Sequence, residues 1–180
     1  MNVDWNQIVK PDWTLFLDRD GVINERIIGG YVQNTEQFRF LDGVLEAMAV
    51  FAGRFRRIVL ITNQQGIGKG LMTVTQLSEI HAMMKTEIER NGGRVDAIFA
   101  CPQLASDPDN YRKPNPRMAQ MACERFSEID LSKTIMVGDG HLDMEFGRNA
   151  GTYNVFIGSA DELADDCFGN LYDFSIVLAK

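Results

Sequence analysis

Five short stretches of the chain are apolar on consecutive residues rather than on alternate ones. Runs of this kind are typical of strands that are buried on both faces of a parallel sheet. The stretches cover residues 14–17, 58–61, 96–100, 134–137 and 153–157. We therefore predict five strands at these places, in a sheet that helices cover.

Patterns with helical spacing lie between the predicted strands. They cover residues 41–52, the stretch from Thr73 to the Asn91-Gly92-Gly93 sequence, residues 116 to about 126, and residues 142–150. Asp42 suits the N-cap of the first helix, and Thr73 and Gln76 form a capping box at the second. Strands that alternate with helices predict an α/β fold: a doubly wound, Rossmann-like, mostly parallel sheet of about five strands with helices on both faces.

The composition is that of an ordinary globular protein. Hydrophobic residues make up 45% of the 180 residues and charged residues 24%, which is enough for one core without disulfides. The three cysteines, Cys101, Cys123 and Cys167, form no CxxC pair, which indicates reduced thiols and a cytoplasmic setting. We see no repeat and no linker, so we expect one domain over residues 1–180 and a monomer.

Acidic residues outnumber basic ones by 25 to 18, and the formal net charge is −7. This balance argues against nucleic-acid binding, which needs a basic face. No apolar run approaches the length of a membrane span, and residues 1–11 are too polar for a signal peptide. We expect neither nucleic acid nor a membrane as a partner, whereas a small anionic substrate is compatible with local cations.

Polar residues follow the carboxyl ends of four predicted strands. Ligands of open α/β sheets bind at this edge, so these side chains should lie close together. They are Asp18 and Asp20 after the first strand, Thr62 at the end of the second, Lys113 after the third strand and its loop, and Asp139 after the fourth, with Asp143 one helical turn further on.

These residue types suit the transfer of a phosphoryl group. Carboxylates from different strands form a hard oxygen site for Mg²⁺, and their crowding makes a metal almost obligatory. A carboxylate beside the metal can attack phosphorus, and one two residues further on can protonate the leaving oxygen and later activate water. Thr62 and Lys113 would hold the phosphoryl oxygens.

The strand-end motifs resemble the four motifs of the haloacid dehalogenase superfamily, in the same order and over nearly the whole chain. They are the runs Asp18 to Asn24, Thr62 to Gln64, Arg112 to Pro114, and Gly138-Asp139. More narrowly, the sequence is similar to the phosphatases that act on D-glycero-D-manno-heptose 1,7-bisphosphate and to the related histidinol-phosphate phosphatases. The narrower marks are residues 16–21, 30–32, 40–44, 62–67 and 112–116.

The resemblance implies a Mg²⁺-dependent phosphomonoester hydrolase without a separate cap domain, acting on a small phosphorylated metabolite. The expected substrate is heptose 1,7-bisphosphate first and histidinol phosphate second. Asp18 would be nucleophile and metal ligand, Asp20 general acid and base and a ligand through its backbone carbonyl, and Asp139 the third ligand. Thr62 and Lys113 would stabilise the phosphoryl group, and Asn63, Gln64, Arg112, Gly30 and Tyr31 would bind substrate.

Two stretches depart from the pattern of this family. The family often carries a zinc loop with a Cys-x-His pair followed by Cys-x-Cys, and here the matching positions read Cys101-Pro102-Gln103 and Asp109-Asn110-Tyr111. One soft ligand is too few for structural zinc, so we predict none. The segment from Asn24 to Tyr31 is longer than expected. Both stretches should border the substrate, so the resemblance to the family does not by itself identify the substrate of this protein.

Some residues and one other class of protein keep a second interpretation. Asp143 is placed behind the metal ligands, but it equally suits a first-turn acid that faces the helix dipole. We expect His81 to be structural. His141 follows Asp139 closely, and contact with substrate is the less favoured of its two interpretations. The competing class is a signalling receiver, which also phosphorylates an aspartate in a doubly wound sheet. Receivers carry that aspartate on a middle strand and a pair of acids on the first strand. Here the paired acids Asp18 and Asp20 end the first strand and a second acidic site follows the fourth, which favours the hydrolase.

Overall fold

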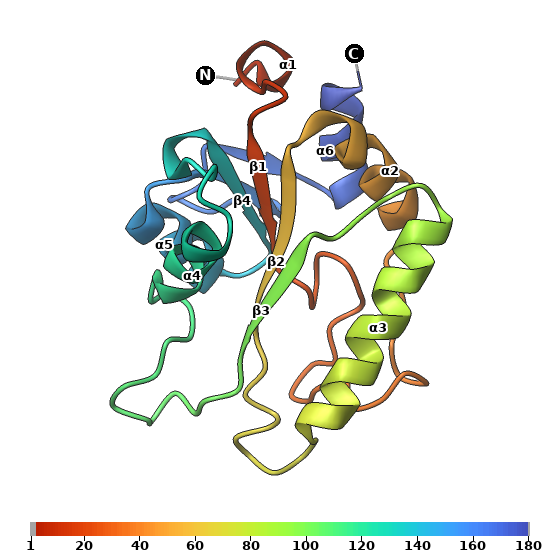
Figure 1. Cartoon of the computed structure of the whole chain (residues 1–180), viewed down its shortest axis with the longest axis vertical. Helices are drawn as coiled ribbons and strands as arrows, with labels where there is room; N and C mark the ends of the chain where they lie inside the picture. The colour runs from red at the N-terminus through yellow and green to blue at the C-terminus, as the bar shows by residue number, and fades with distance from the viewer. Residues whose placement is uncertain (1–2, 180) are drawn as a thin grey trace.

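The computed structural model describes residues 3–179 and is built around one six-stranded parallel sheet (Figure 1). The strands are β1 (Thr14–Leu17), β2 (Arg57–Asn63), β3 (Ala97–Cys101), β4 (Thr134–Gly138), β5 (Tyr153–Ile157) and β6 (Asp166–Phe168). Their order in the sheet is β3-β2-β1-β4-β5-β6. The doubly wound fold and its five predicted strands are confirmed. Strand β6 was not predicted, because it has three half-buried residues and no apolar run.

Helices cover both faces of the sheet. They are α1 (Trp5–Ile8), α2 (Val44–Arg54), α3 (Val74–Arg90), α4 (Arg117–Arg125), α5 (His141–Ala150) and α6 (Leu171–Leu178), with a 3-10 turn at Leu131–Lys133. Leu15 and Leu17 of β1 pack on the side of α2, α3 and α6, whereas Phe16 packs on the side of α4 and α5. Because both faces of β1 are covered, its apolar residues are consecutive.

Two helix starts illustrate what the sequence could and could not predict. At α3 the capping box is confirmed, with Gln76 N donating to Thr73 Oγ1 at 3.1 Å and Thr73 N to Gln76 Oε1 at 2.8 Å. At α2 the expected N-cap Asp42 is wrong, and Gly43 takes that position with a φ of 74°. A Cβ on Gly43 would lie 2.7 Å from Tyr172, so the packing of α6 on α2 favours glycine there.

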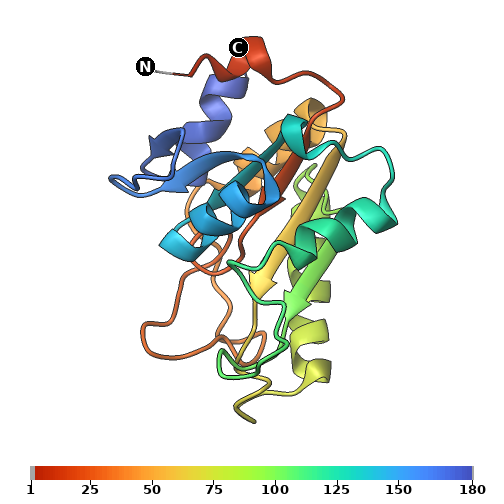
Figure 2. The same ribbon diagram turned by 90° about the vertical axis from the view of Figure 1, so that its left-hand side faces the viewer.

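The carboxyl ends of the strands and three long loops meet at one end of the molecule. The loops cover residues 18–43, 64–73 and 102–116, while α1 and α6 lie at the opposite end (Figures 1 and 2). Strand β1 pairs with β2 on one side and with β4 on the other, and this is the point where strand order reverses. No helix among residues 3–179 is long and apolar enough to cross a membrane.

Candidate active site

Three carboxylates meet beyond the ends of β1 and β4. Asp18 follows β1, Asp139 follows β4, and Asp143 lies in the first turn of α5. One oxygen of each lies within 4.8 Å of the others. Burial and the charge of Asp18 raise the pKa of Asp139 to about 7, and burial, together with Asp143, raises the pKa of Asp18 to about 6. Burial and mutual repulsion both disfavour the ionised cluster, so nearby cations stabilise it.

Two glycines make room for these carboxylates. A Cβ on Gly21, which has a φ of 91°, would lie 1.9 Å from Asp139 Oδ2. A Cβ on Gly138 would lie 2.2 Å from the Cβ of Asp143. The Asp-Gly and Gly-Asp sequences at the ends of β1 and β4 are therefore a packing requirement of the carboxylate cluster.

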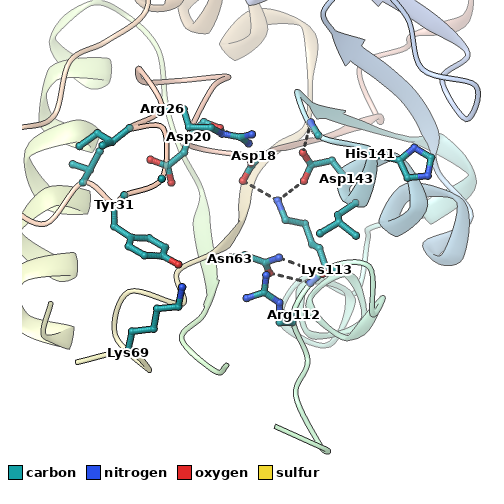
Figure 3. A pocket seen from close by; sticks show the side chains of 16 residues that line it. Asp18, Asp20, Arg26, Tyr31, Asn63, Lys69, Arg112, Lys113, His141 and Asp143 are labelled. Atoms are coloured by element: carbon teal, nitrogen blue, oxygen red, sulfur yellow. Dashed lines mark hydrogen bonds and ion pairs between the residues drawn. The ribbon is translucent and has the colours of Figure 1, made fainter. Parts of the chain in front are cut away.

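Lys113 supplies one of these cations. Its Nζ lies 2.8 Å from Asp18 Oδ1 and 2.6 Å from Asp143 Oδ1, and donates to the Ile61 carbonyl at 2.8 Å (Figure 3). Burial alone would lower the pKa of Lys113, but Asp143 and Asp18 outweigh burial and raise it. Asn63 holds the Lys113 backbone, accepting from its N–H at 2.9 Å and donating to its carbonyl at 3.2 Å. The lysine is thus fixed on the end of β2.

Asp20 is held by three donors on the other side of Asp18. Arg19 Nη2 contacts both carboxylate oxygens at 2.9 and 3.0 Å, and Asn24 Nδ2 and Gln64 Nε2 each donate at 2.9 Å. Burial alone would raise the pKa of Asp20, but the charge of Arg19 and these hydrogen bonds lower it. Arg19 is itself fully buried and its Nη1 lies 3.3 Å from His81 Nε2 on α3. Asp20 is therefore ionised and oriented at neutral pH.

A pocket of about 570 Å³ opens over these groups. Asp18 and Asp143 lie on one side of it, and Tyr31, Lys69 and Arg112 lie on the other (Figure 3). Lys69 Nζ lies 5.3 Å from the centre of the Tyr31 ring, and Arg112 Nη1 donates to Gln65 Oε1 at 3.1 Å. Among the ion pairs of residues 3–179, none includes Lys69 or Arg112. The far wall therefore suits an anionic group.

Comparison with known proteins shows the family to which this chain belongs. The family model described as polynucleotide kinase 3 phosphatase matches residues 15–154. A D-glycero-alpha-D-manno-heptose-1,7-bisphosphate 7-phosphatase of Mycobacterium bovis is 34% identical over 173 residues, which cover 92% of this chain and 91% of the relative. The chain belongs to the heptose bisphosphate phosphatases of the haloacid dehalogenase superfamily. It is a phosphatase.

Two further proteins agree with this membership. A D-glycero-beta-D-manno-heptose-1,7-bisphosphate 7-phosphatase of Vibrio cholerae is 35% identical over 151 residues, covering 80% of this chain and 78% of the relative. The crystal structure of the D,D-heptose 1,7-bisphosphate phosphatase from B. bronchiseptica, in complex with magnesium and phosphate, has a TM-score of 0.83 at 30% identity. The match covers 92% of this chain and 97% of the chain in that crystal structure. The resemblance inferred from the four motifs is confirmed, and the enzyme is favoured over the receiver.

Most of the site residues that the sequence predicted line the pocket of this phosphatase. They are Asp18, Asp20, Gly30, Tyr31, Asn63, Arg112 and Lys113. Thr62 and Gln64 are each 1% exposed and lie behind the pocket, where Gln64 Nε2 donates to Thr62 Oγ1 at 2.9 Å. Asp139 is covered by the guanidinium of Arg26 at 2.6 Å. The predicted roles of these residues stay predictions.

Asp143 and His141, whose roles were left open, both line the pocket. One oxygen of Asp143 accepts a hydrogen bond from Gly140 N at 3.0 Å at the start of α5, and its other oxygen pairs with Lys113. His141 Nδ1 lies 2.8 Å from Asp161 Oδ2. Asp143 thus joins the carboxylate cluster directly, while it also caps the helix.

Two cations of the site, Arg26 and Lys69, were not predicted from the sequence, and neither was the role of Arg19. Arg26 lies in the segment that departs from the family, so no motif marks it. Lys69 belongs to the glycine-rich run 66–70. Lys69 forms none of the ion pairs of residues 3–179, which indicates a cation available to a ligand, and this can be seen only in the structure. Arg19 stands between the two catalytic candidates, and nothing in its sequence context predicts complete burial.

The loop at the positions of the expected zinc pattern is held by hydrogen bonds. Gln103 Oε1 accepts from Tyr111 N at 3.0 Å and lies 3.7 Å from Cys101 Sγ. Tyr111 Oη donates to the Ala100 carbonyl at 3.3 Å. Positions 101, 103 and 111, which match positions of the zinc pattern, thus contact one another directly through protein atoms.

Proposed function

We propose that this phosphatase hydrolyses D-glycero-D-manno-heptose 1,7-bisphosphate through a phospho-aspartate on Asp18. The observation that carries the proposal is the pocket itself. Its inner side holds the carboxylates with Lys113, and its far wall holds Lys69 and Arg112, which suits a substrate with two anionic groups. The α- and β-named relatives are 34% and 35% identical, so identity favours neither anomer.

Mg²⁺ fits the donor set of this site. The three clustered carboxylates supply hard oxygen ligands, and burial, together with repulsion within the cluster, raises the pKa values of Asp18 and Asp139. Asp18, Asp139 and the backbone carbonyl of Asp20 would hold the ion. When bound, Mg²⁺ would neutralise charge on the phosphoryl oxygens. The hydrogen-bonded loop at Cys101 supports our expectation that zinc is not needed.

Asp18 is the nucleophile of the proposed reaction. Its carboxylate oxygen attacks phosphorus, the bond from phosphorus to the ester oxygen breaks, and the phosphoryl group is transferred to Asp18. Lys113, 2.8 Å from Asp18, keeps that carboxylate ionised and then faces the transferring oxygens. Thr62, at the end of β2, supports the same group.

Asp20 moves the protons. The negative phosphate raises the pKa of Asp20, whose carboxylate takes up a proton from solvent as the substrate binds and then passes that proton to the leaving alkoxide. The Asp20 carboxylate next removes a proton from water, and the water oxygen displaces Asp18 from phosphorus. Arg19, Asn24 and Gln64 favour the ionised form of Asp20 that this second step needs.

We further propose that residues 1–180 act as one hydrolase domain and as a monomer in the cytoplasm. The three free cysteines support a reducing compartment. Light scattering on the purified protein, measured with and without Mg²⁺, tests the monomer.

The decisive experiment measures phosphate release with Mg²⁺ from each anomer of heptose 1,7-bisphosphate and from histidinol phosphate. We expect a preference of at least about tenfold in kcat/KM for one heptose anomer, with Asp18→Asn as the inactive control. Equal and weak activity on all three substrates would overturn the substrate but keep the phosphatase. Turnover by Asp18→Asn would overturn the mechanism.

A further inference from the structure

Arg26 lies at the carboxylate cluster although it belongs to none of the motifs. Its Nη2 donates to Asp139 Oδ1 at 2.6 Å and to the backbone carbonyl of Asp20 at 3.2 Å. Within residues 3–179 no other cation forms an ion pair with Asp139. One nitrogen thus contacts two of the oxygen groups that the proposed function assigns to Mg²⁺. The guanidinium and a metal ion cannot both occupy this place.

Only one of the two cations at the cluster is free to leave. Lys113 is 2% exposed and is shared by Asp18 and Asp143, so it is fixed. The Arg26 side chain is 48% exposed, and an ion pair with this much solvent contact is weak. With all three carboxylates ionised, they and the two cations together carry one negative charge. Exchange of Arg26 for a divalent ion would make the cluster neutral, which favours the exchange.

Arg26 also begins a turn that forms one wall of the pocket. Gly30 N donates to the Ile27 carbonyl at 3.1 Å, and Gly29 has a φ of 71°. Ile27, Gly29 and Gly30 line the pocket, and Ile28 at the tip is 96% exposed. Residues 25–30 are all exposed, so the side chain of Arg26 is an important contact between the turn and the ends of β1 and β4.

We propose that Arg26 is an internal counterion of the metal site and is exchanged for Mg²⁺ when the metal binds. The exchange releases the turn at residues 27–30, so metal binding and the shape of the substrate pocket are coupled. Arg26 acts here as a positioning residue: it keeps Asp139 and the Asp20 carbonyl in place until the metal arrives. The inference rests on the Mg²⁺ site of the proposed function.

Titration with MgCl₂, followed by calorimetry and by the rise in Tm, tests the exchange without substrate. The variants are Arg26→Ala, Arg26→Gln, which keeps more of the side-chain stem, and the control Arg39→Ala. Arg39 is an exposed cation of the same loop whose guanidinium donates to the Phe38 carbonyl. We expect both Arg26 variants to bind Mg²⁺ about twofold to fivefold more tightly than the wild type, the range of a partly exposed ion pair. Arg39→Ala should match the wild type.

Hydrogen exchange supplies the second readout. In the wild type, Mg²⁺ should accelerate amide exchange at residues 26–31; in Arg26→Gln, exchange should be fast with and without the metal. Equal Mg²⁺ affinity of the wild type and both Arg26 variants would overturn the exchange while leaving the proposed Mg²⁺ site intact. An effect of Mg²⁺ on these amides that is the same in Arg26→Gln would also overturn it. No Mg²⁺ binding by any protein would overturn the Mg²⁺ site and the exchange together.

Discussion

The Lys113 ammonium group lies 2.8 Å from the carboxylate of Asp18, and both side chains are buried, at 2% and 8% exposure. The same ammonium group contacts Asp143 at 2.6 Å. A charge that loses its partner in such a place has no solvent to replace it. The three groups therefore support both the fold and the proposed chemistry, and mutations at Lys113 should affect both.

Lys113→Met should abolish turnover and lower the free energy of unfolding by about 3–5 kcal/mol, because it leaves two buried carboxylates unpaired. Urea unfolding at pH 7 measures the loss. The double variant Lys113→Met with Asp143→Asn should recover part of that stability but no activity, since one of the two carboxylates is then neutral. Lys69→Met, which removes a cation outside the cluster, should change stability by less than about 0.5 kcal/mol. A Lys113→Met protein as stable as wild type would contradict this account.

Asp20→Asn should slow both the formation and the hydrolysis of the phospho-enzyme, each by about 10² to 10⁴-fold, because the amide cannot exchange the proton. Rapid quenching of the reaction, with detection of phosphate bound to Asp18, separates the two steps. The amide keeps the size of the side chain and can still accept from Arg19, so the fold should persist. Unchanged rates would remove Asp20 from the scheme.

Gly21→Ala should disturb the carboxylate cluster, because the new Cβ would overlap Asp139 Oδ2 and the φ of 91° disfavours alanine. We expect a stability loss of more than about 1 kcal/mol and weaker activation by Mg²⁺. Gly53→Ala is the matched control, since it lies within α2 with nothing close to its Cβ. That variant should gain about 0.5–1 kcal/mol. Thermal melts and Mg²⁺ titrations of the two variants make the comparison, and equal behaviour would refute the packing argument.

His81 should contribute to acid sensitivity. Burial and the neighbouring charge of Arg19 lower the pKa of His81 to about 4. Between about pH 6.5 and pH 4, His81 is protonated in the unfolded chain but neutral in the folded protein. The free energy of unfolding therefore decreases as the pH falls through this range. The loss is about 2 kcal/mol at pH 5.

His81→Gln removes this titration, so its stability should fall less than that of wild type between pH 7 and pH 5. Urea unfolding at both pH values measures the difference. His141→Gln is the control, because the Asp161 carboxylate raises the pKa of His141, and that contribution is lost as the pH rises rather than as it falls. Parallel acid losses in wild type and His81→Gln would show that His81 does not carry the effect.

Metal analysis of the purified protein should find well under one zinc per chain, and a chelator should leave the loop at residues 101–113 folded. The physical reason is that Gln103 and Tyr111 join this loop by a hydrogen bond. Gln103→Ala should instead loosen it, which hydrogen exchange would detect. A content of about one zinc per chain would contradict the prediction that this protein binds no structural zinc.

The sequence by itself determined the sheet and most of its functional edge. Strands buried on both faces need consecutive apolar residues, and a parallel sheet brings the polar residues after β1, β2 and β4 to one edge. For that reason the sequence alone predicts that Asp18, Asp20 and Asp139 lie at this edge. The capping box at Thr73 is equally local, because all of its atoms lie within one turn.

Only the tertiary structure decided how these groups are paired. The contact of Arg26 with Asp139 joins residues 113 positions apart, and Gln64 reaches Asp20 across 44 positions. Neither pair follows from local propensity, since both depend on how the loops fold over the strand ends. The complete burial of Arg19 also depends on the tertiary structure. A buried guanidinium needs a carboxylate partner, and the folded loops bring Asp20 into contact with Arg19.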